Sequence, residues 1–240
     1  MKPAQTSKII SVLLFIGVEL TAYSQGSFQN LNFEDAFVTQ YAPGSSVPVG
    51  SAFPGWTAYY GSVQTGTNAA SLVGYDLSPL SGPVVSINDS NPPLVYPETA
   101  ISGHYSAALF GGRLLLPQPA DNAAMLSQTA LVPEDARSLQ FKARFQTTEA
   151  VSLGGQVLEL VPLAVFPEYF LLGADITPFA GQVLELRITI PPPPSGSPFR
   201  NFNLFDDFAF SNQIIPEPSV LGLLGLGALV LGRRVLRRRP

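Results

Sequence analysis

The feature that most constrains the fold is a strict alternation of polar and apolar side chains in two segments of the chain. Residues Ser138–Gln146 alternate without a fault, and Gln182–Ile190 repeats the pattern. This period is that of a β-strand with one buried face and one solvated face. Four prolines, Pro191–Pro194, end the second segment, because proline cannot donate a hydrogen bond to a ladder. The alternation therefore predicts two half-buried strands.

The composition extends this β pattern through the middle of the chain. The 240 residues include 21 glycines and 23 prolines, whereas charged residues make up only 12%. Short apolar runs separated by such turn residues are typical of a β-sandwich. The further runs are Phe28–Phe33, Thr57–Val63, Pro83–Ile87, Tyr105–Phe110, Ala123–Ala130, Gln156–Leu163 and Phe202–Ser211. We therefore predict an all-β sandwich.

Two local motifs refine this prediction. The sequence Gly-Gln-Val-Leu-Glu-Leu occurs at Gly155–Leu160 and again at Gly181–Leu186, which predicts two similar strands, each entered through a glycine turn. The segment Asp175–Phe179 predicts a single helical turn that Asp175 caps. Because the chain has no cysteine, a core of adequate size has to stabilise the fold.

The N-terminus has the pattern of a secretory signal peptide. Lys2 and Lys8 precede the apolar segment Ile9–Leu20. The small residues Ala22 and Ser24 stand three and one positions before a cleavage point ahead of Gln25. Charge, length and cleavage pattern together predict that signal peptidase removes residues 1–24. Without cleavage, the same segment would be an N-terminal membrane anchor.

The C-terminus has three parts in a fixed order. The triplet Pro216, Glu217 and Pro218 is followed by an apolar run, Ser219–Gly232, and then by a basic stretch, residues 233–240. The basic stretch contains Arg233, Arg234, Arg237, Arg238 and Arg239. Prolines keep the triplet extended, and the arginines hold their end of the run on the side of the membrane where the chain is made. The alternatives are an ordinary transmembrane anchor, although the run is shorter than the ~20 residues of a comfortable span, and an amphipathic surface helix.

This order of parts resembles the PEP-CTERM sorting signal of Gram-negative bacteria. The resemblance implies recognition by an exosortase, an integral-membrane cysteine transpeptidase. It also implies a transient stay in the inner membrane and delivery to the cell surface or extracellular matrix. In that family the signal accompanies exopolysaccharide production and biofilm formation. We therefore predict a signal peptide at 1–24, a β-domain at 25–213 and the sorting signal at 214–240, with a short transmembrane helix at 219–232.

The charge of the exported part limits its partners. Between Gln25 and Ile215 the chain has six basic and fifteen acidic residues, a net charge of −9, whereas the whole chain has −4. Nucleic-acid binding needs a basic surface that displaces counterions. The sequence therefore predicts no nucleic-acid partner.

One carboxylate falls in an apolar row of the last strand. Asp206 has the same parity as Phe202, Leu204, Phe208 and Phe210, so a regular strand would turn it toward the core. A buried carboxylate needs an arginine, backbone amides or a cation as a partner. The alternative is a β-bulge at Asp206-Asp207, which would shift the register and turn Asp206 outward.

Short motifs across the domain resemble jelly-roll carbohydrate-binding modules. They are Asn30–Asp35, Pro54-Gly55-Trp56 and Phe205–Phe208. The resemblance implies a jelly-roll-like sandwich. In many such modules a structural calcium joins the first and last strands, and here Glu34 and Asp206 would be its ligands, with backbone carbonyls completing the oxygen shell. An absent calcium site is the alternative, and no other cofactor is implied.

Three aromatic residues are candidates for sugar stacking. Trp56, the only tryptophan, is followed by Tyr59 and Tyr60, and aromatic faces and polar tips suit a sugar ring. Core packing of Trp56, directly after a turn, is the stronger interpretation. In a regular strand only one of the two tyrosines can face the core.

Enzymatic functions have little support in the sequence. His104 is the only histidine, and no nucleophile-elbow motif accompanies it. A glycosidase needs two carboxylates at a defined distance, and no spacing indicates such a pair. We therefore predict a non-enzymatic, exported protein with a structural or polysaccharide-associated role. A module with a specific glycan ligand and a surface glycoside hydrolase are the alternatives.

Overall fold

A computed structural model describes residues 27–62, 66–77, 83–90, 99–114, 120–145, 149–194 and 201–215. The signal-peptide residues Ala22, Ser24 and Gln25, the triplet Pro216–Pro218 and the basic stretch lie outside these ranges. No helix within them has the length and hydropathy of a membrane span.

The described chain consists almost entirely of β-strands. The strands are β1 (Ser46–Pro48), β2 (Thr57–Ser62), β3 (Gly66–Ala69), β4 (Leu72–Tyr75), β5 (Val84–Asp89), β6 (Tyr105–Leu114), β7 (Ala120–Leu131), β8 (Ser138–Ala143), β9 (Ala150–Leu153), β10 (Gln156–Val157), β11 (Val161–Val165), β12 (Phe170–Asp175), β13 (Val183–Ile190) and β14 (Asn201–Ser211). The helices are a four-residue α1 (Val49–Ala52) and the 3-10 turn η1 (Thr177–Phe179).

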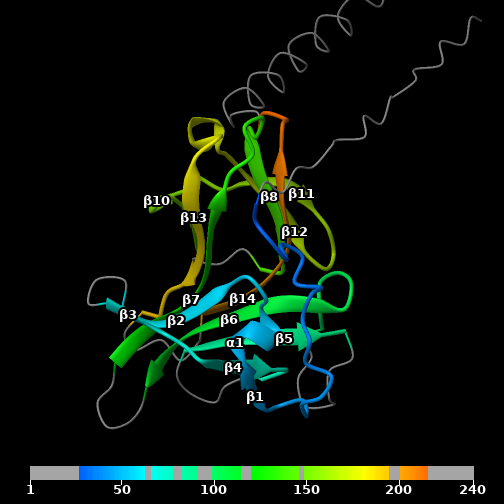
Figure 1. Cartoon of the computed structure of the whole chain (residues 1–240), viewed down its shortest axis with the longest axis vertical. Helices are drawn as coiled ribbons and strands as arrows, with labels where there is room; N and C mark the ends of the chain where they lie inside the picture. Colours follow the sequence, from blue (N-terminus) through cyan, green and yellow to red (C-terminus); the bar gives the residue numbers. More distant parts are fainter. Residues whose placement is uncertain are drawn as a thin grey trace, which may run out of the picture.

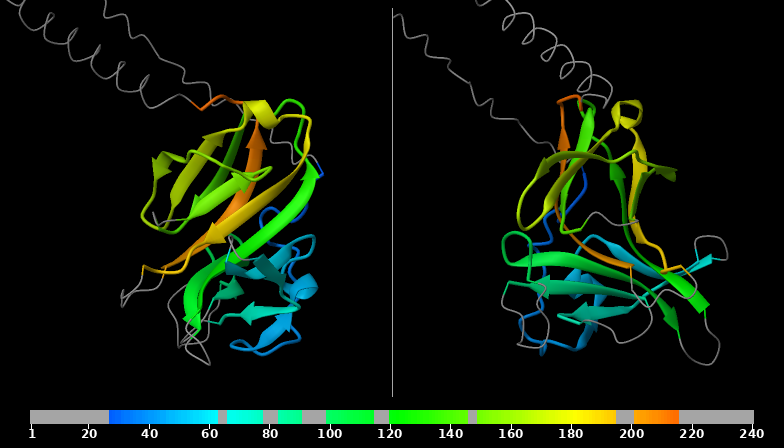
Figure 2. Two further views of the ribbon diagram at one scale, coloured as in Figure 1. Left: turned by 90° about the vertical axis from the view of Figure 1, so that its left-hand side faces the viewer. Right: turned by 180° about the vertical axis from the view of Figure 1, so that it is seen from behind.

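The strands form two sheets joined at one hairpin (Figure 1). One sheet has the order β1-β4-β5-β6-β14-β8-β12-β11, and the other has the order β3-β2-β7-β13-β9-β10. All pairs are antiparallel except β4 with β5. The β6–β7 pairing links the sheets into one curled surface, and Figure 2 shows the two layers from the side and from behind. The predicted all-β, jelly-roll-like sandwich is confirmed.

The main core lies between the two layers. Leu126 and Ile188 reach it from one sheet, and Phe141 and Phe208 reach it from the other. A smaller apolar cluster, Ala108, Phe110 and Leu204, lies on the opposite face of β6 and β14, packed against Phe202 and Ile101. The sheet of β6, β8 and β14 therefore has apolar contacts on both faces near its middle.

Most predicted strands are present, but two are wrong. Phe28–Phe33 forms turns, because Asn30 and Phe33 have positive φ angles of 49° and 59°. The run Gln156–Leu163 is broken, since Leu158–Leu160 separate β10 from β11. The other predicted runs form strands, among them Thr57–Ser62 and Val84–Asp89. In the predicted turn at Asp175–Phe179, η1 forms, and the Asp175 carboxylate accepts the Thr177 amide hydrogen at 2.8 Å.

Both ends of the described chain lie at the same end of the sandwich (Figure 1). The Ser27 amide donates to the Leu131 carbonyl at the end of β7. The Arg137 amide, six residues further on, donates to the Ser211 carbonyl at the end of β14. The two segments that flank the domain therefore start from one pole of the molecule.

Trp56 is a core residue, so the sugar-stacking interpretation of this residue is wrong. Its side chain is only 4% exposed and packs against the rings of Phe33 and Phe208, with centroids 5.6 and 6.3 Å away. The indole Nε1 donates to the Asn30 carbonyl at 3.0 Å. A ring that is buried in this way has no exposed face on which a sugar could stack.

We expect Trp56→Ala to lower the free energy of unfolding by about 3–5 kcal/mol, as large aromatic-to-alanine changes in cores do. Tyr59→Ala, a few residues away on the outer face, should cost far less. Urea unfolding followed by far-UV circular dichroism measures both. Equal, small losses for the two variants would show that Trp56 is not part of the core.

Candidate functional site

A β-bulge in β14 determines where the two adjacent aspartates point. Asp206 pairs with Lys142 of β8 and Ala209 pairs with Gln140, so β14 has one extra residue between these pairs. Asp207 has a positive φ of 49°. The extra residue inverts the alternation, so the prediction of a single apolar row along β14 is wrong. Phe208 faces the main core, and the row that contains Asp206 faces away from it.

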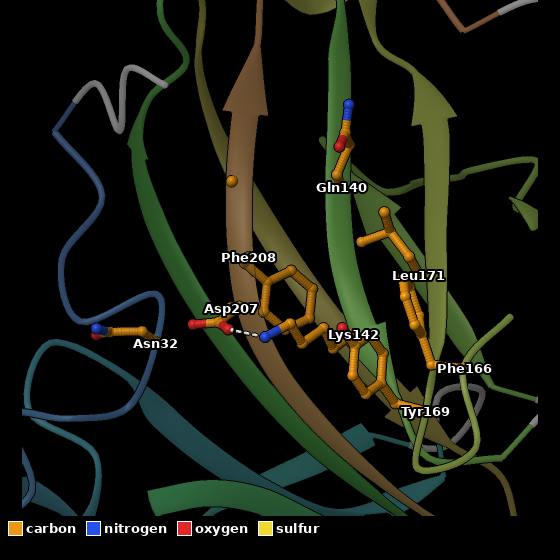
Figure 3. Close-up of a pocket in the computed structure, with 9 residues that line it drawn as sticks. Asn32, Gln140, Lys142, Phe166, Tyr169, Leu171, Asp207 and Phe208 are labelled. Atoms are coloured by element: carbon orange, nitrogen blue, oxygen red, sulfur yellow. Dashed lines mark ion pairs between the residues drawn. The ribbon is translucent and has the colours of Figure 1, made fainter. Parts of the chain in front are cut away.

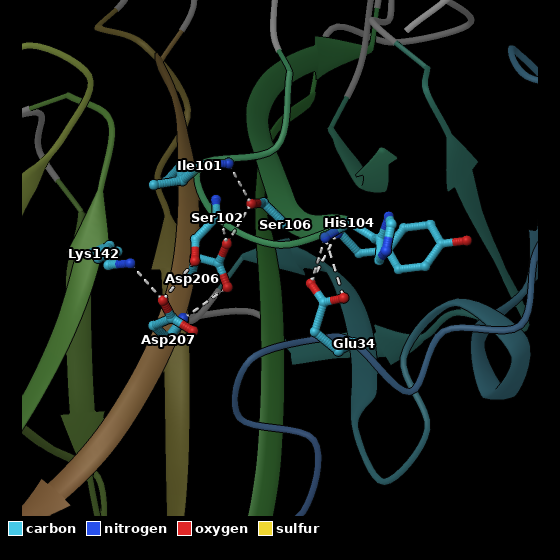
Figure 4. Close-up of polar contacts among 9 residues, drawn as sticks. Glu34, Ile101, Ser102, His104, Ser106, Lys142, Asp206 and Asp207 are labelled. Atoms are coloured by element: carbon cyan, nitrogen blue, oxygen red, sulfur yellow. Dashed lines mark hydrogen bonds and ion pairs between the residues drawn. The ribbon is translucent and has the colours of Figure 1, made fainter. Parts of the chain in front are cut away.

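The alternative prediction, a bulge at Asp206-Asp207, is confirmed, but Asp206 is not turned to solvent. Its side chain is 1% exposed, because the loop 101–106 covers it (Figure 4). The Asp206 carboxylate accepts the Ser106 hydroxyl at 2.7 Å and the Ser102 amide at 3.2 Å. It also accepts the amide of Asp207 at 2.8 Å. Of the three partners considered from sequence, backbone amides are present, and a serine hydroxyl, which was not considered, joins them.

Glu34 binds the same segment between the two residues that contact Asp206. Its carboxylate accepts the amide hydrogens of His104, at 2.9 and 3.1 Å, and of Tyr105, at 3.0 Å (Figure 4). Gly103 makes this approach possible, since a Cβ there would lie 2.3 Å from Glu34 Oε1. His104 is exposed and precedes β6. Glu34 and Asp206 thus hold one loop on the sheet.

These two carboxylates do not fit the predicted calcium site. Calcium prefers a shell of oxygen ligands, whereas N–H and O–H donors of the loop face Glu34 and Asp206. Within the described ranges, no group of three or more histidine, cysteine or acidic residues is arranged to hold a metal ion. The loop contacts both Glu34 and Asp206, so it links the two residues that the resemblance expected a calcium ion to join.

A second acidic cluster lies near the end of β5. The Asp89 amide donates to Asp76 Oδ1 at 2.9 Å, and the Tyr75 hydroxyl donates to Asp89 Oδ2 at 2.7 Å. Burial raises the pKa of Asp76 to about 6, against the lowering effect of the Asp89 amide. Neither aspartate was among the site residues predicted from sequence.

The candidate binding site is a groove of about 460 Å³ on the outer face of β8, β12 and β14 (Figure 3). Gln140 and Lys142 of β8 line it, since they alternate with the core residues of that strand. Leu171 of β12 lies opposite Lys142 in the ladder. Asp207 of β14 and Asn32 of the N-terminal turns complete the polar part of the lining.

Two stacked aromatic rings form one wall of the groove. Phe166 and Tyr169 belong to the turn between β11 and β12, which the Phe166 amide closes by donating to the Tyr169 carbonyl at 2.9 Å. Their ring centroids lie 4.7 Å apart with an interplanar angle of 30°. Lys142 Nζ lies 5.0 Å from the Tyr169 centroid, and Phe166 is the outer ring, 44% exposed. An exposed aromatic face beside polar side chains is the arrangement that a sugar ring requires.

An ion pair joins the groove to the covered loop. Lys142 Nζ lies 2.6 Å from Asp207 Oδ2, and the same oxygen accepts the Ser102 hydroxyl at 2.9 Å. Burial alone would lower the pKa of Lys142, but the hydrogen bond and charge of Asp207 raise it. Lys142 is therefore held as a cation at a fixed place in the groove.

The predicted aromatic residue Tyr59 lies outside this groove. Tyr60 packs against the main core and its hydroxyl accepts the Val85 amide at 3.1 Å. Tyr59 therefore faces outward on β2, where the Arg187 guanidinium lies 5.7 Å from its ring centroid. Only one of the two tyrosines faces the core, as predicted. The stacking role of Tyr59 stays a prediction, on the other sheet.

The sequence analysis missed the groove residues Lys142, Phe166 and Tyr169. A signal was present, since Phe166-Pro167-Glu168-Tyr169 places two aromatics around a turn. Their proximity to Lys142 and Asp207, however, depends on which strands are neighbours, and the alternation of one strand does not contain that information.

Comparisons with known proteins address the tail and the fold. Residues 215–239 match the family described as the PEP-CTERM protein-sorting motif. The tail is therefore a PEP-CTERM sorting signal, as predicted, and it suggests an exported protein that an exosortase processes. No curated protein matches the chain.

Two solved structures match the chain with low TM-scores. One is TmCBM61 in complex with beta-1,4-galactotriose, with 14% identity and a TM-score of 0.40, covering 78% of this chain and 97% of that chain. The other is the enzymatically active domain of bacteriophage CBA120 tailspike protein 4, with 16% identity and a TM-score of 0.34. That match covers 65% of this chain but only 19% of the tailspike chain.

We expect stability to fall as the pH rises from about 5 to 8, because burial raises the pKa of Asp206 to about 7, above its ordinary 3.8. A carboxyl with a higher pKa in the folded chain binds its proton more tightly there, so its contribution is complete below about pH 4 and is lost through pH 7. Melting temperatures of the wild type and Asp206→Asn across this range measure the effect. The variant should show a shallower fall, and an unchanged slope would contradict the assignment.

Proposed function

We propose that this chain is an exported, non-enzymatic β-sandwich protein that binds polysaccharide in the groove beside Phe166. The observation that carries the proposal is the exposed Phe166–Tyr169 stack next to Lys142, Asp207, Asn32 and Gln140. The sorting signal supports a place at the cell surface or in the extracellular matrix, where polysaccharides are available.

The route to that place follows from the two ends of the chain. Signal peptidase removes residues 1–24 and frees the domain that starts at Gln25. The triplet Pro216–Pro218 is then presented to an exosortase-type membrane transpeptidase while Ser219–Gly232 lies in the inner membrane and residues 233–240 stop transfer. Because both described ends lie at one pole of the domain, the segments that enter the two membrane-directed processing steps leave the sandwich at the same end.

The chemistry of the groove favours binding over hydrolysis. A glycosidase of the usual kind uses two carboxylates on opposite sides of the scissile bond. Among the described residues that line the groove, Asp207 is the only carboxylate, and it is paired with Lys142 at 2.6 Å. Asp206, its neighbour, is covered by the loop 101–106. The described lining residues therefore include no pair of carboxylates on opposite sides of the groove.

Affinity electrophoresis against a panel of neutral and acidic polysaccharides tests the proposal. We expect retardation by at least one polymer, and a loss of about tenfold in affinity for Phe166→Ala, since an aromatic contact contributes about 1 kcal/mol beyond its buried area. Phe37→Ala is the matched control, because Phe37 is an exposed phenylalanine, at 62%, that does not line the groove.

The other outcomes separate the alternatives. Binding that survives Phe166→Ala but not Tyr59→Ala would move the site to the outer face of the other sheet. Absence of retardation by every polymer would leave a purely structural matrix protein, and release of reducing sugars from any polymer would indicate a surface hydrolase. Each of these results would overturn the proposal.

A further inference from the structure

We propose that the groove selects neutral polysaccharides, and that the Lys142–Asp207 ion pair binds two neighbouring hydroxyl groups of one sugar as a unit. This inference rests on the proposed function of the groove and specifies its ligand class.

The charges around the groove favour a neutral ligand. Lys142 is the only cation among the described lining residues, and Asp207 already neutralises it. A carboxylate of an acidic sugar would have to displace Asp207 from Lys142 while lying next to it, and it would approach a domain of net charge −9. Like charges at short distance oppose binding. A neutral chain meets no such repulsion.

The hydrogen-bonding groups of the groove match hydroxyl groups. The Lys142 ammonium only donates and the Asp207 carboxylate only accepts, whereas a hydroxyl does both. Neighbouring hydroxyls of a sugar ring lie close together, so one accepts from Lys142 while the other donates to Asp207. The amides of Asn32 and Gln140, each with a donor and an acceptor, line the same groove and suit further hydroxyls.

The ion pair is held in place before a ligand arrives. The Asp207 carboxylate also accepts the Ser102 hydroxyl, and the backbone at Asp207 is fixed by the bulge. The Lys142 ammonium lies against the Tyr169 ring, and Phe166 stacks on that ring (Figure 3). A sugar placed on the exposed Phe166 ring therefore has its edge directed to a fixed donor and a fixed acceptor. Groups that are already ordered lose less entropy on binding.

Isothermal titration of the full chain tests the ligand class. The probes are a β-1,4-galactan, a mixed-linkage β-glucan and a β-mannan, each before and after periodate oxidation with borohydride reduction, and polygalacturonate. Periodate cleaves the bond between neighbouring hydroxyl-bearing carbons and opens the ring, and borohydride leaves the two hydroxyls on separated carbons. The treated polymers therefore keep the backbone linkages but no longer present a closed ring with a neighbouring hydroxyl pair. We expect at least one untreated neutral polymer to bind, its treated form to bind at least tenfold more weakly, and polygalacturonate to bind at least tenfold more weakly.

Matched variants test the role of the ion pair. Lys142→Met and Asp207→Asn should each lower the affinity for the neutral polymer at least tenfold. The double variant should bind about as weakly as either single variant, because paired groups act together. Asparagine tolerates the positive φ at position 207, and a melting temperature confirms folding. Arg187→Met is the control, since it breaks a similar ion pair, with Glu185 at 2.9 Å, outside the groove.

The failures of the two proposals are distinguishable. If neither the neutral polymers nor polygalacturonate bind, the proposed function fails. If polygalacturonate binds more tightly than the neutral polymers, or if periodate treatment or Lys142→Met changes nothing while Phe166→Ala abolishes binding, polysaccharide binding stands and the neutral-hydroxyl inference is overturned.

Discussion

The one-residue bulge in β14 is the constraint on which the core, the covered loop and the groove all depend. The bulge, at which Asp207 has a positive φ, gives β14 one residue more than its partner strand. Phe208 and Phe210 therefore face the core. The same shift leaves Asp206 under the loop 101–106 and Asp207 beside Lys142. A regular strand would satisfy only one of these requirements, since alternation places neighbouring residues on opposite faces.

Most residues of the motifs that resemble carbohydrate-binding modules hold the fold together. Asn30 holds the turn that Trp56 packs against, through its carbonyl to the indole and its side chain to the Asp35 amide. Asp206 binds Ser102 and Ser106, and Glu34 binds the backbone of His104 and Tyr105 between them. Two motif residues, Asn32 and Asp207, also line the groove, and the other candidate ligand residues come from the β11–β12 turn, β8 and β12. In this fold the residues with the clearest sequence pattern are those that hold the core together.

Particular residues show which parts of the fold the sequence alone predicts. Alternation correctly predicted β8 and β13, because one face of each strand is buried and the other is solvated. It was wrong for Phe28–Phe33, where positive φ angles make turns of an apolar run. It also missed β12, β9 and the short strands at the edges, whose burial depends on their neighbours. The groove forms because β8 pairs with β12 and β14. Such long-range pairing cannot be predicted from the pattern of a single segment.

The sorting signal and the face that carries the candidate groove come together at Ile215, the first residue of the PEP-CTERM match. Gly173 of β12 has no side chain there, and a Cβ would lie 2.5 Å from Ile215 Cδ1. The start of the tail is thus packed on the strand that also lines the groove. The most direct test of the groove is amine-reactive labelling of Lys142, the only lysine between Gln25 and Ile215, read by peptide mass spectrometry. We expect a saturating neutral polysaccharide to slow labelling at Lys142 several-fold, and an unchanged rate under saturation would contradict polysaccharide binding in this groove.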